Sequence, residues 1–501
     1  MKVAGFLLAL GLAVPFHAAS LARSIDHLLA TSPAAHGGFF GIQVTDLKTG
    51  RTLYQLNADR LFVPASNTKL FTTALALERL GPQFTFETRV AADRPPDADG
   101  CIRGSLRLVG GGDPNLSGRA VSFEPQPGRA ALPPGDALAA LAELADQIAA
   151  AGVKCIDGDI VGDDTWYVWE PYAEDWSIGD PTFEYGAAVS AIAINDNTLT
   201  VTVSPGAREG DPAAIALNPA VEYYRVDNRI RTVAEGGNRA IAVHRAPGSL
   251  ELQLWGTIPL GAPGHDLALG IEDPAEYAAL ALRQLIEERG IAVNGNALAR
   301  HLLPTETAKA PTAEAPVAEG AAVILARHVS APLVEDLRIT DKLSQNLHAE
   351  MALRAVGRAR RGEGSRAAGL AELRAFLTEA GIADAAYNIE DGSGLSSPNL
   401  VTPAAVVKLL RYMYLTPARD TWISLLPVAG RDGTLVRRFD DTLAAGRIHA
   451  KTGTLAHVNA LSGYARRRDG SWIAFSILAN NSTERAAVRA VIDRIGILLV
   501  K

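Results

Sequence analysis

Cysteine, basic charge and metal-binding patterns are all scarce in this sequence. Its 501 residues include two cysteines, which are too few for a scaffold of disulfides or for a site of four thiolates. Lysine and arginine total 48 against 55 acidic residues, so the net charge is −7 and we expect no nucleic acid partner. The ten histidines form no His-Glu-x-x-His pattern and no Gly-x-x-x-x-Gly-Lys loop occurs, so we expect no metal and no other cofactor.

Long apolar runs are also scarce, and the one that stands out lies at the N-terminus. Lys2 precedes the apolar run 3–16, and several small residues follow it, from Ala18 to Ala22. This is the order of a secretory signal peptide, which we assign to residues 1–22; an amphipathic first helix of the fold is the alternative. No later run is long enough to span a bilayer. The sequence therefore predicts an exported, periplasmic protein, soluble or peripherally associated with a membrane.

The two cysteines stand in similar surroundings. Cys101 begins the stretch Cys-Ile-Arg-Gly-Ser-Leu and Cys155 begins Cys-Ile-Asp-Gly-Asp-Ile, and both stretches have the alternation of a strand. Export would place them in an oxidising compartment. We therefore expect a structural disulfide between Cys101 and Cys155, with two buried free thiols as the alternative.

Predicted strands cluster at both ends of the chain, and helices accompany each cluster. Residues 38–56 predict a hairpin that turns at Lys48-Thr49-Gly50, and residues 66–80 predict a helix. Near the other end, strand patterns joined at Asp469-Gly470 precede a final helix from Thr483. We therefore predict one split α/β domain, 23–85 plus 325–501, whose sheet takes strands from both ends. The other helical patterns in its second part are 333–361, 369–380 and 402–415, and its strand patterns are 448–454, 460–465 and 471–479.

Residues 86–324 have a different texture from the two ends. Short strands and turns rich in Gly, Pro and Asp dominate, with two helical patterns at 136–151 and 274–289. Residues 305–320 are rich in Pro, Ala, Thr and Glu and predict a linker or surface loop. At roughly 150 residues per domain, the chain length also favours two or three domains. We predict that 86–324 is a β-rich insertion with room for two subdomains, the second at about 205–258.

A hydroxyl and an amine are three positions apart in Ser66-Asn67-Thr68-Lys69, at the start of the first predicted helix. Residues i and i+3 share a helix face, so the Lys69 amine can approach the Ser66 hydroxyl. A serine needs a neighbouring base to act as a nucleophile, and a lysine can be that base when burial or a nearby cation lowers its pKa. Alone the pattern is weak, because a capping serine beside a solvated lysine explains it equally well.

Two further patterns combine hydroxyl, amide and amine groups. Ser344 and Asn346 lie two positions apart between helical stretches, so in an extended loop they point the same way. The pattern Lys451-Thr452-Gly453-Thr454 lies on a predicted strand, where Gly453 would let a substrate backbone lie close. Taken singly, these patterns are an ordinary helix cap and a strand with a surface lysine.

Together the three patterns are much more specific. Ser-x-x-Lys on a helix, Ser-x-Asn in a loop and Lys-Thr-Gly on a strand are the set found in penicillin-binding proteins and serine β-lactamases. From Ser66 to Ser344 the separation is 344 − 66 = 278 residues, too long for a single-domain β-lactamase, and the predicted insertion accounts for the excess. The chain resembles the class C low-molecular-mass penicillin-binding proteins, the D-alanyl-D-alanine carboxypeptidase/endopeptidase family. Besides the three motifs, the resemblance includes residues 64–69, 111–114, 162–165, 391–396 and 426–430, and Gln345 stands where many relatives have Asp.

The resemblance implies a fold and an activity. The fold is of the α/β class: an α+β sandwich like that of serine β-lactamases and penicillin-binding proteins, with an antiparallel sheet between helices on both faces and β-rich inserted domains. The implied activity is that of an exported serine D-Ala-D-Ala carboxypeptidase/endopeptidase. Its partners would be peptidoglycan peptides ending in D-Ala-D-Ala and their crosslinks, and β-lactam antibiotics would inhibit it covalently through an acyl-enzyme.

The resemblance also implies residue roles in acylation. Ser66 is the expected nucleophile and Lys69 the expected acylation base. Ser344 would relay the proton to the leaving amine, and Asn346 would hold Lys69 and the substrate amide. Lys451 would favour the neutral form of Lys69.

Substrate recognition is expected to involve the strand motif and the insertion. Lys451, Thr452 and Thr454 would bind the terminal carboxylate, and the N–H groups of Ser66 and Thr454 would form the oxyanion hole. In related proteins an acidic residue of the insertion meets the amine of diaminopimelate, and Asp164 in Gly162-Asp163-Asp164-Thr165 is the candidate. The alternative for Asp164 is a turn aspartate that caps its own backbone.

Two other activities remain as alternatives. A serine β-lactamase or esterase could use the same fold, but no clear Glu-x-x-x-Asn occurs between Asn346 and Lys451 to supply the deacylating glutamate of a β-lactamase. A catalytically silent cell-wall binding protein would need a broken motif, whereas all three motifs are intact.

Overall fold

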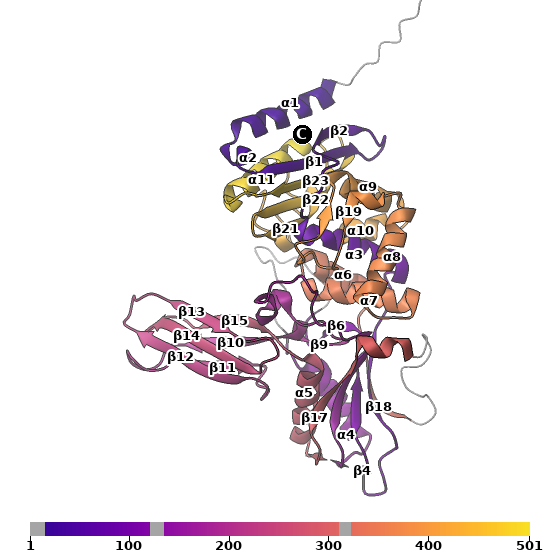
Figure 1. The fold of residues 1–501 in the computed structure, drawn as a ribbon, viewed down its shortest axis with the longest axis vertical. Coiled ribbons are helices and arrows are strands. Elements are labelled where there is room, and N and C mark those ends of the chain that lie inside the picture. Colours follow the sequence, from indigo (N-terminus) through magenta and orange to yellow (C-terminus); the bar gives the residue numbers. More distant parts are fainter. Residues whose placement is uncertain (1–15, 121–134, 310–321) are drawn as a thin grey trace, which may run out of the picture.

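The structure is a computed structural model that describes residues 16–120, 135–309 and 322–501. The molecule is elongated, with the N-terminal helix and the C-terminus at one end and a β-rich part at the other (Figure 1). Most of the predicted signal segment 1–22 lies outside the described residues. Helix α1 (Phe16–Thr31) is described, and its Leu21, Ile25 and Leu28 are buried in one core with α11 (Arg485–Leu499). The packed fold therefore includes Leu21.

A five-stranded sheet joins the two ends of the chain, which confirms the predicted fold class. Its order is β2-β1-β23-β22-β21, and every neighbouring pair is antiparallel. Side chains of the central strands are buried on both faces, as expected for a sheet between two layers of helices. The strands are β1 (Phe39–Asp46), β2 (Thr52–Leu56), β21 (Ile448–Leu455), β22 (Val458–Arg466) and β23 (Trp472–Asn480).

Helices cover both faces of this sheet. α1, α11 and the short α2 (Pro33–His36) share a core with one face, and the larger group of helices shares a second core with the other. The long helical pattern 333–361 is divided at Ser344, where φ is +65° and a right-handed helix cannot continue. The second group comprises α3 (Lys69–Leu80), α6 (Leu333–Lys342), α7 (Asn346–Arg361), α8 (Arg366–Glu379), α9 (Pro403–Leu415) and α10 (Arg419–Leu425).

A second five-stranded sheet forms the body of the inserted region. Its order is β17-β8-β5-β3-β18, and α4 (Ala139–Ala150) and α5 (Pro274–Glu288) pack in its core. The strand at one edge, β18, pairs with β3, the first strand of the predicted insertion 86–324. The strands are β3 (Glu87–Ala92), β5 (Leu106–Val109), β8 (Ile160–Val168), β17 (Ala297–Leu302) and β18 (Val323–Val329).

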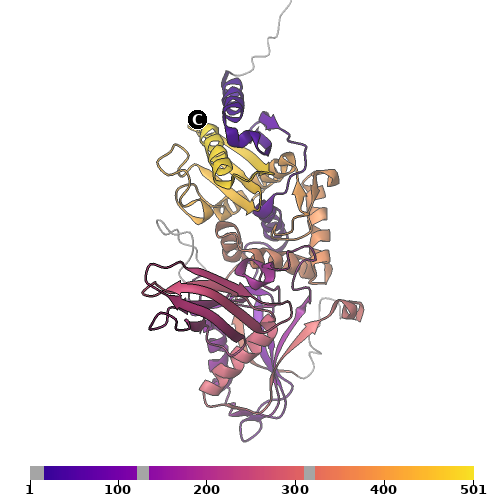
Figure 2. The same ribbon diagram turned by 60° about the vertical axis from the view of Figure 1, so that its left-hand side comes forward.

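Two three-stranded sheets form an arm that projects from this body in Figure 1 and comes to the front in Figure 2. They span 198–270 and contain the segment of about 205–258 that the sequence predicted as a second subdomain. One sheet contains β10 (Thr198–Ser204), β11 (Ala214–Asn218) and β15 (His265–Gly270), and the other contains β12 (Arg225–Val233), β13 (Ala240–His244) and β14 (Glu251–Pro259).

The smallest sheets tie distant segments together. Cys101 and Cys155 are direct partners in the parallel pair β4 (Cys101–Ile102) and β7 (Cys155–Ile156), and a disulfide joins them with a Cα–Cα distance of 4.6 Å. The third strand of that sheet is β16 (Ala292–Val293). The other small pairs are β6 (Asp113–Leu116) with β9 (Ile192–Ile194), and β19 (Tyr387–Asn388) with β20 (Leu400–Val401).

Across the part of the chain that the structure describes, no helix combines the length and the apolar composition needed to cross a membrane.

Candidate active site

Ser66 lies in a tight turn between the sheet and a buried helix. A 3₁₀ turn, Ala65–Thr68, leads directly into α3, and Ser66 is partly exposed while Lys69 is completely buried. Ala65, just before the serine, has a φ of +48°, a strained conformation for a residue with a side chain. Asn67 fastens the turn to β21 by donating its side-chain amide to the Lys451 carbonyl at 3.1 Å. The hydroxyl is thus presented at a fixed place above the helix N-terminus.

The Lys69 amine lies within hydrogen-bond distance of three neutral oxygens. Its Nζ lies 3.0 Å from Ser66 Oγ, 2.6 Å from Asn346 Oδ1 and 2.6 Å from the Ser393 carbonyl. Burial, and then the charge of Lys451, lower the pKa of Lys69 well below the ordinary lysine value, although the more distant carboxylates of Asp391, Glu350 and Asp341 oppose this. A neutral amine next to Ser66 Oγ is the arrangement that a general base requires.

Lys451 and Ser344 form the second half of the cluster. Lys451 is buried on β21, and its Nζ donates to Ser344 Oγ at 2.8 Å and to the Thr452 carbonyl at 3.2 Å. Burial lowers the pKa of Lys451 to about 8, and Asp341 opposes the shift. The left-handed conformation of Ser344 turns its hydroxyl toward this lysine while α7 begins at Asn346. The structure therefore brings Ser66, Lys69, Ser344, Asn346 and Lys451 into one connected cluster.

The strand motif beside the cluster has one role that the sequence did not reveal. A Cβ added to Gly453 would lie 2.5 Å from the Pro64 carbonyl, so this glycine leaves room for the turn that carries Ser66. The packing of this turn is therefore enough to explain a glycine at position 453. The contact of Gly453 with a substrate backbone stays a prediction. Thr452 donates its hydroxyl to Thr434 Oγ1 at 2.8 Å, and Thr454 is exposed at the sheet edge.

The loop 391–396 completes the site, although no role had been assigned to it from the sequence. The Ser393 carbonyl accepts from Lys69, and Gly394, with φ +85°, lies so close to the Ala65 carbonyl that a Cβ would come within 2.0 Å of it. Asp391 holds the loop by accepting from the N–H groups of Gly394 and Ser396, both at 2.7 Å. The glycine pattern of this segment was the signal for a tight loop.

Asp341 is a buried carboxyl group that sequence patterns did not single out. It accepts from the Thr73 hydroxyl at 3.0 Å, and its other oxygen has no hydrogen-bond partner among the described residues. Burial raises its pKa to about 7, even though Lys451 and Lys69 stabilise its ionised form. Asp341 therefore sets part of the electrostatic balance between the two lysines.

The inserted region contributes directly to the site. The Asn346 side-chain amide donates to the Tyr185 carbonyl at 2.7 Å, and the Trp176 indole donates to Asp391 Oδ2 at 3.1 Å. A polar cavity of about 170 Å³ lies where insertion residues Glu184, Tyr185, Asp196 and Thr198 face residues 343–346. None of these insertion residues had been singled out as a site residue.

Asp164 does not have the position predicted for it. It is 2% exposed on β8, and its two oxygens accept from Ser190 Oγ at 2.8 Å and meet His301 Nδ1 at 2.9 Å. The carboxylate therefore has no oxygen open to a substrate amine. The alternative of a backbone cap is also wrong for Asp164, since the residue that bonds locally is Asp163, to the N–H of Thr165.

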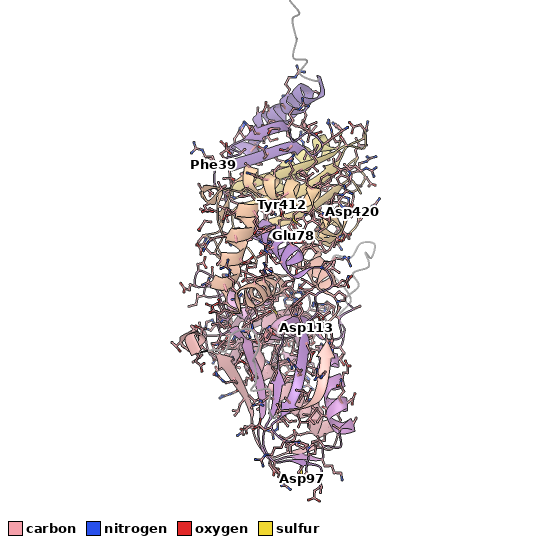
Figure 3. The ribbon with its side chains drawn as sticks, turned by 90° about the vertical axis from the view of Figure 1, so that its right-hand side faces the viewer. Phe39, Glu78, Asp97, Asp113, Tyr412 and Asp420 are labelled. Carbon is pink, nitrogen blue, oxygen red and sulfur yellow. A yellow bond between two sulfur atoms is a disulfide. The ribbon has the colours of Figure 1, made fainter. Side chains whose placement is uncertain are left out.

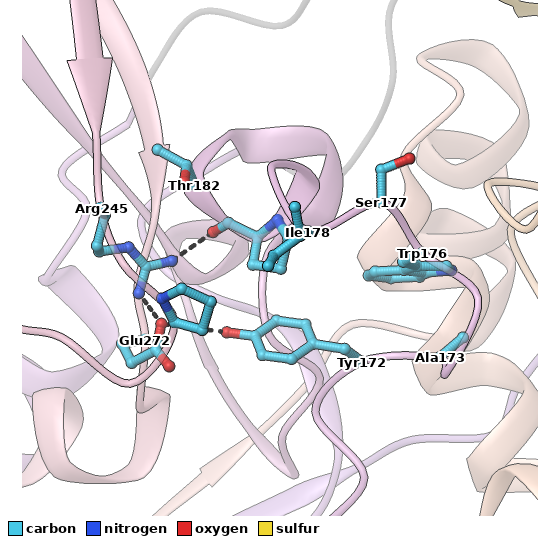
Figure 4. A pocket seen from close by; sticks show the side chains of 10 residues that line it. Tyr172, Ala173, Trp176, Ser177, Ile178, Thr182, Arg245 and Glu272 are labelled. Atoms are coloured by element: carbon cyan, nitrogen blue, oxygen red, sulfur yellow. Dashed lines mark hydrogen bonds and ion pairs between the residues drawn. The ribbon is translucent and has the colours of Figure 1, made fainter.

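A second cavity, of about 260 Å³, lies within the insertion and is shown in Figure 4. Tyr172, Trp176 and Ile178 form apolar walls, and Arg245 is paired with Glu272 on one side. Trp176 connects this cavity to the Asp391 loop.

Within the described ranges, no group of three or more His, Cys, Asp or Glu side chains is arranged to hold a metal ion.

Comparisons with known proteins agree over nearly the whole chain. The D-alanyl-D-alanine carboxypeptidase of Actinomadura sp. (strain R39) is 35% identical over 492 residues, covering 96% of this chain and 84% of that protein. The carboxypeptidase DacB of Haemophilus influenzae is 25% identical over 485 residues, covering 94% and 90%. The crystal structure of penicillin-binding protein 4 (dacB) from H. influenzae has a TM-score of 0.77 at 23% identity and covers 95% of this chain and 98% of that one, which shows a shared fold.

Residues 21–500, nearly the whole chain, match the D-Ala-D-Ala carboxypeptidase 3 (S13) family. This range begins at Leu21, whose side chain is buried in the core. The chain therefore belongs to the D-Ala-D-Ala carboxypeptidase 3 family of serine peptidases (S13).

Proposed function

We propose that this serine-type D-Ala-D-Ala carboxypeptidase works through an acyl-enzyme on Ser66 and accepts both peptidoglycan stem peptides and their crosslinks. The observation that carries the proposal is the buried Lys69 amine 3.0 Å from Ser66 Oγ, with neutral acceptors around it. A lysine in these surroundings can accept a proton at neutral pH, which a solvated lysine cannot.

In the first half-reaction Ser66 Oγ attacks the carbonyl carbon of the penultimate D-Ala. A C–O bond forms as the hydroxyl proton moves to Lys69 Nζ, and the N–H groups of Ser66 and Thr454 receive the developing oxyanion. The C–N bond then breaks, and the proton held by Lys69 passes through Ser344 to the leaving amine, which returns Lys69 to its neutral form. Ser344 Oγ accepts from Lys451, which orients it for this relay. D-Ala, or the crosslinked neighbour, departs.

In the second half-reaction water hydrolyses the ester. Lys69 takes a proton from the water as it attacks the acyl carbon, and Ser66 recovers its proton as the C–O bond to the enzyme breaks. The product is a stem peptide that ends in a free D-Ala carboxylate.

Recognition of the substrate terminus is proposed for the edge of β21. Lys451 supplies a cation and Thr454 a donor for the carboxylate of the terminal D-Ala, and the Thr452 hydroxyl turns away from Thr434 to supply another. Partial exposure of Thr452 and exposure of Thr454, next to a buried Lys451, supports this assignment.

Covalent inhibition by β-lactams is part of the same proposal. A β-lactam presents an amide carbonyl to the serine and leaves a stable ester. The names of two relatives support it: a penicillin-sensitive carboxypeptidase A of Dictyostelium discoideum is 28% identical over 477 residues, and H. influenzae penicillin-binding protein 4 has been solved in complex with a β-lactam.

Export is proposed from the order of the N-terminal residues. Leu21 is buried against the fold, so only cleavage before Leu21 would leave the core intact. We therefore propose that the signal peptide ends at residue 20 or earlier, instead of at the predicted residue 22. N-terminal sequencing of the mature protein tests this, and a mature chain that begins after Leu21, or one that keeps Met1, would contradict it.

The activity is tested by incubating the protein with a stem-like peptide ending in D-Ala-D-Ala and with a crosslinked dimer. We expect release of D-Ala from the first substrate and of monomers from the second. With penicillin we expect an acyl-enzyme whose hydrolysis is slower than the turnover of the peptide. Rapid penicillin turnover without D-Ala release would instead indicate a β-lactamase.

A further inference from the structure

A closed ring of polar side chains lies at the junction between the insertion and the helices of the catalytic domain. Asp196 accepts from Arg119 NH1 at 2.7 Å and meets His348 Nε2 at 3.0 Å. His348 Nδ1 lies 2.6 Å from Asp336 Oδ1, which also accepts from the Asn115 amide at 3.1 Å. Arg119 closes the ring to Asn115 Oδ1 at 3.4 Å. The junction lies near Asp113, which is labelled in Figure 3 and lies two residues before Asn115 on β6.

The ring is buried and its charges balance. His348 is completely buried, and the side chains of Asp336, Asp196 and Arg119 are 6%, 13% and 17% exposed. Burial alone would lower the pKa of His348, but the carboxylates of Asp336 and Asp196 outweigh it and raise the pKa to about 9. Burial works against ionisation of Asp196 too, yet His348 and Arg119 lower its pKa below the ordinary range. Two cations thus face two carboxylates, which is the condition for keeping charges in the interior.

Gln345, the middle residue of the Ser344-Gln345-Asn346 motif, is attached to this ring. Its Nε2 donates to Asp196 Oδ2 at 2.9 Å, and its Oε1 accepts from the Leu347 N–H at 3.1 Å as the N-cap of α7. The residues on either side are the strained Ser344, which accepts from Lys451, and Asn346, which accepts from Lys69.

We propose that Asp196 of the insertion is a positioning residue for the reaction, and that Gln345 is the matched group through which it acts. The pair locks the turn that presents Ser344 and Asn346 to the two lysines. The inference rests on the proposed function, since it assigns to the insertion a part in acylation at Ser66. It gives the middle position of the motif a defined task in this chain.

The proposal explains why an amide suits position 345 here. The side-chain amide both donates to Asp196 and accepts from the helix N-terminus, and no carboxylate can do both. A carboxylate at position 345 would place two negative oxygens about 3 Å apart, and opposed charges of the same sign at that distance repel strongly away from water. The cap of α7 would survive, because an acidic N-cap is favourable at a helix N-terminus.

The test is a double-mutant cycle on the pair. Gln345→Glu keeps the shape and the cap but opposes Asp196, Asp196→Asn removes the charge, and the double variant relieves the repulsion between the two carboxylates. The readouts are the second-order rate constant of acylation by penicillin, KM and kcat for D-Ala release, and the melting temperature. The matched control is Asp493→Asn. Asp493 lies on α11, on the opposite face of the sheet, and this substitution breaks its partly buried ion pair with Arg438.

We expect each single variant to be acylated about 10- to 100-fold more slowly, the range of one charge-assisted hydrogen bond, mainly through kcat. The double variant should recover at least about tenfold over Gln345→Glu, and the Asp493→Asn control should keep the wild-type rate. The inference is overturned if Gln345→Glu is acylated at the wild-type rate. It is also overturned if the fold-loss in the double variant equals the product of the fold-losses in the two single variants. Failure of the wild type itself to be acylated would count against the proposed function instead, so the two failures are distinguishable.

Discussion

The active site and the insertion each withdraw a basic side chain from bulk water, and their surroundings shift its pKa in opposite directions. In the active site Lys69 contacts only neutral oxygens, and its pKa falls. In the insertion His301 lies between the carboxylates of Asp164 at 2.9 Å and Asp273 at 3.1 Å. Burial would lower the pKa of His301, but these carboxylates raise it to about 10. Burial with neutral partners produces a base, whereas burial with opposite charges produces a structural ion pair.

The largest expected effect comes from removing the base. Lys69→Met keeps the length of the side chain but cannot accept a proton, so acylation by penicillin should fall about 10²–10⁴-fold. The structure should hold, since methionine fills a buried space well. Stopped-flow acylation together with a melting curve checks this, and a variant that acylates at the wild-type rate would end the assignment of Lys69 as base.

Removal of the disulfide in the insertion should lower stability without changing the rate of acylation. Replacing Cys101 by Ser opens a loop of 54 residues, for which the chain-entropy model gives a loss of about 4 kcal/mol. Urea unfolding of Cys101→Ser measures this loss. We expect unchanged acylation in the folded fraction, because the bridge lies in a small sheet within the insertion and contacts none of the cluster residues.

His301→Gln tests the other half of the comparison. Removing the cation leaves Asp164 and Asp273 without their shared partner, at a cost of about 2–4 kcal/mol. Since the pKa is raised from 6.5 to about 10, the stabilisation is complete below pH 6.5 and is lost as the pH rises through 10. The difference in unfolding free energy between wild type and variant should therefore shrink from pH 6 to pH 10, and a constant difference would contradict the ion pair.

Lys451 should show a smaller, pH-dependent effect on binding. Its pKa is lowered to about 8, so above that pH it loses the charge proposed to hold the substrate carboxylate. We expect KM for a D-Ala-D-Ala peptide to rise by up to about tenfold per pH unit above pH 8. Lys451→Arg keeps its charge at every accessible pH and should flatten that rise. A wild-type KM that is constant from pH 7 to 10 would remove Lys451 from carboxylate binding.

The sequence predicted the active-site cluster better than it predicted the contacts of the insertion. The five cluster residues all belong to short motifs, each weak alone, and the resemblance carried by the three motifs together pointed to all five. Lys451 and Ser344 are 107 positions apart, and only the combination of motifs indicated that they meet. The antiparallel sheet built from both ends followed from the strand clusters in the same way.

Residues whose partners lie far away in sequence could not be assigned from pattern. Asp163 and Asp164 are neighbours on β8 and face opposite ways, so Asp163 bonds Thr165 two positions away while Asp164 bonds His301 across 137 positions. The pattern Gly-Asp-Asp-Thr therefore suggested a local or substrate role for a residue that has a buried partner. Asp196 and Tyr185 were missed for the same reason, because they reach residues 345 and 346 only through the packing of the insertion.

The protonation of Lys69 is the central claim, and it can be measured directly. Protein that carries Ser66→Ala, which leaves Lys69 in place, and is labelled with carbon-13 at the lysine ε-carbon can be titrated by NMR from pH 6 to 11. We predict that the lysine signal absent from the spectrum of Lys69→Met loses its proton well below the ordinary value of 10.5. A second low signal, near 8, belongs to Lys451 and is absent from the spectrum of Lys451→Arg. A Lys69 signal that titrates at or above 10.5 would contradict the account, because a permanently charged amine cannot take the proton from Ser66.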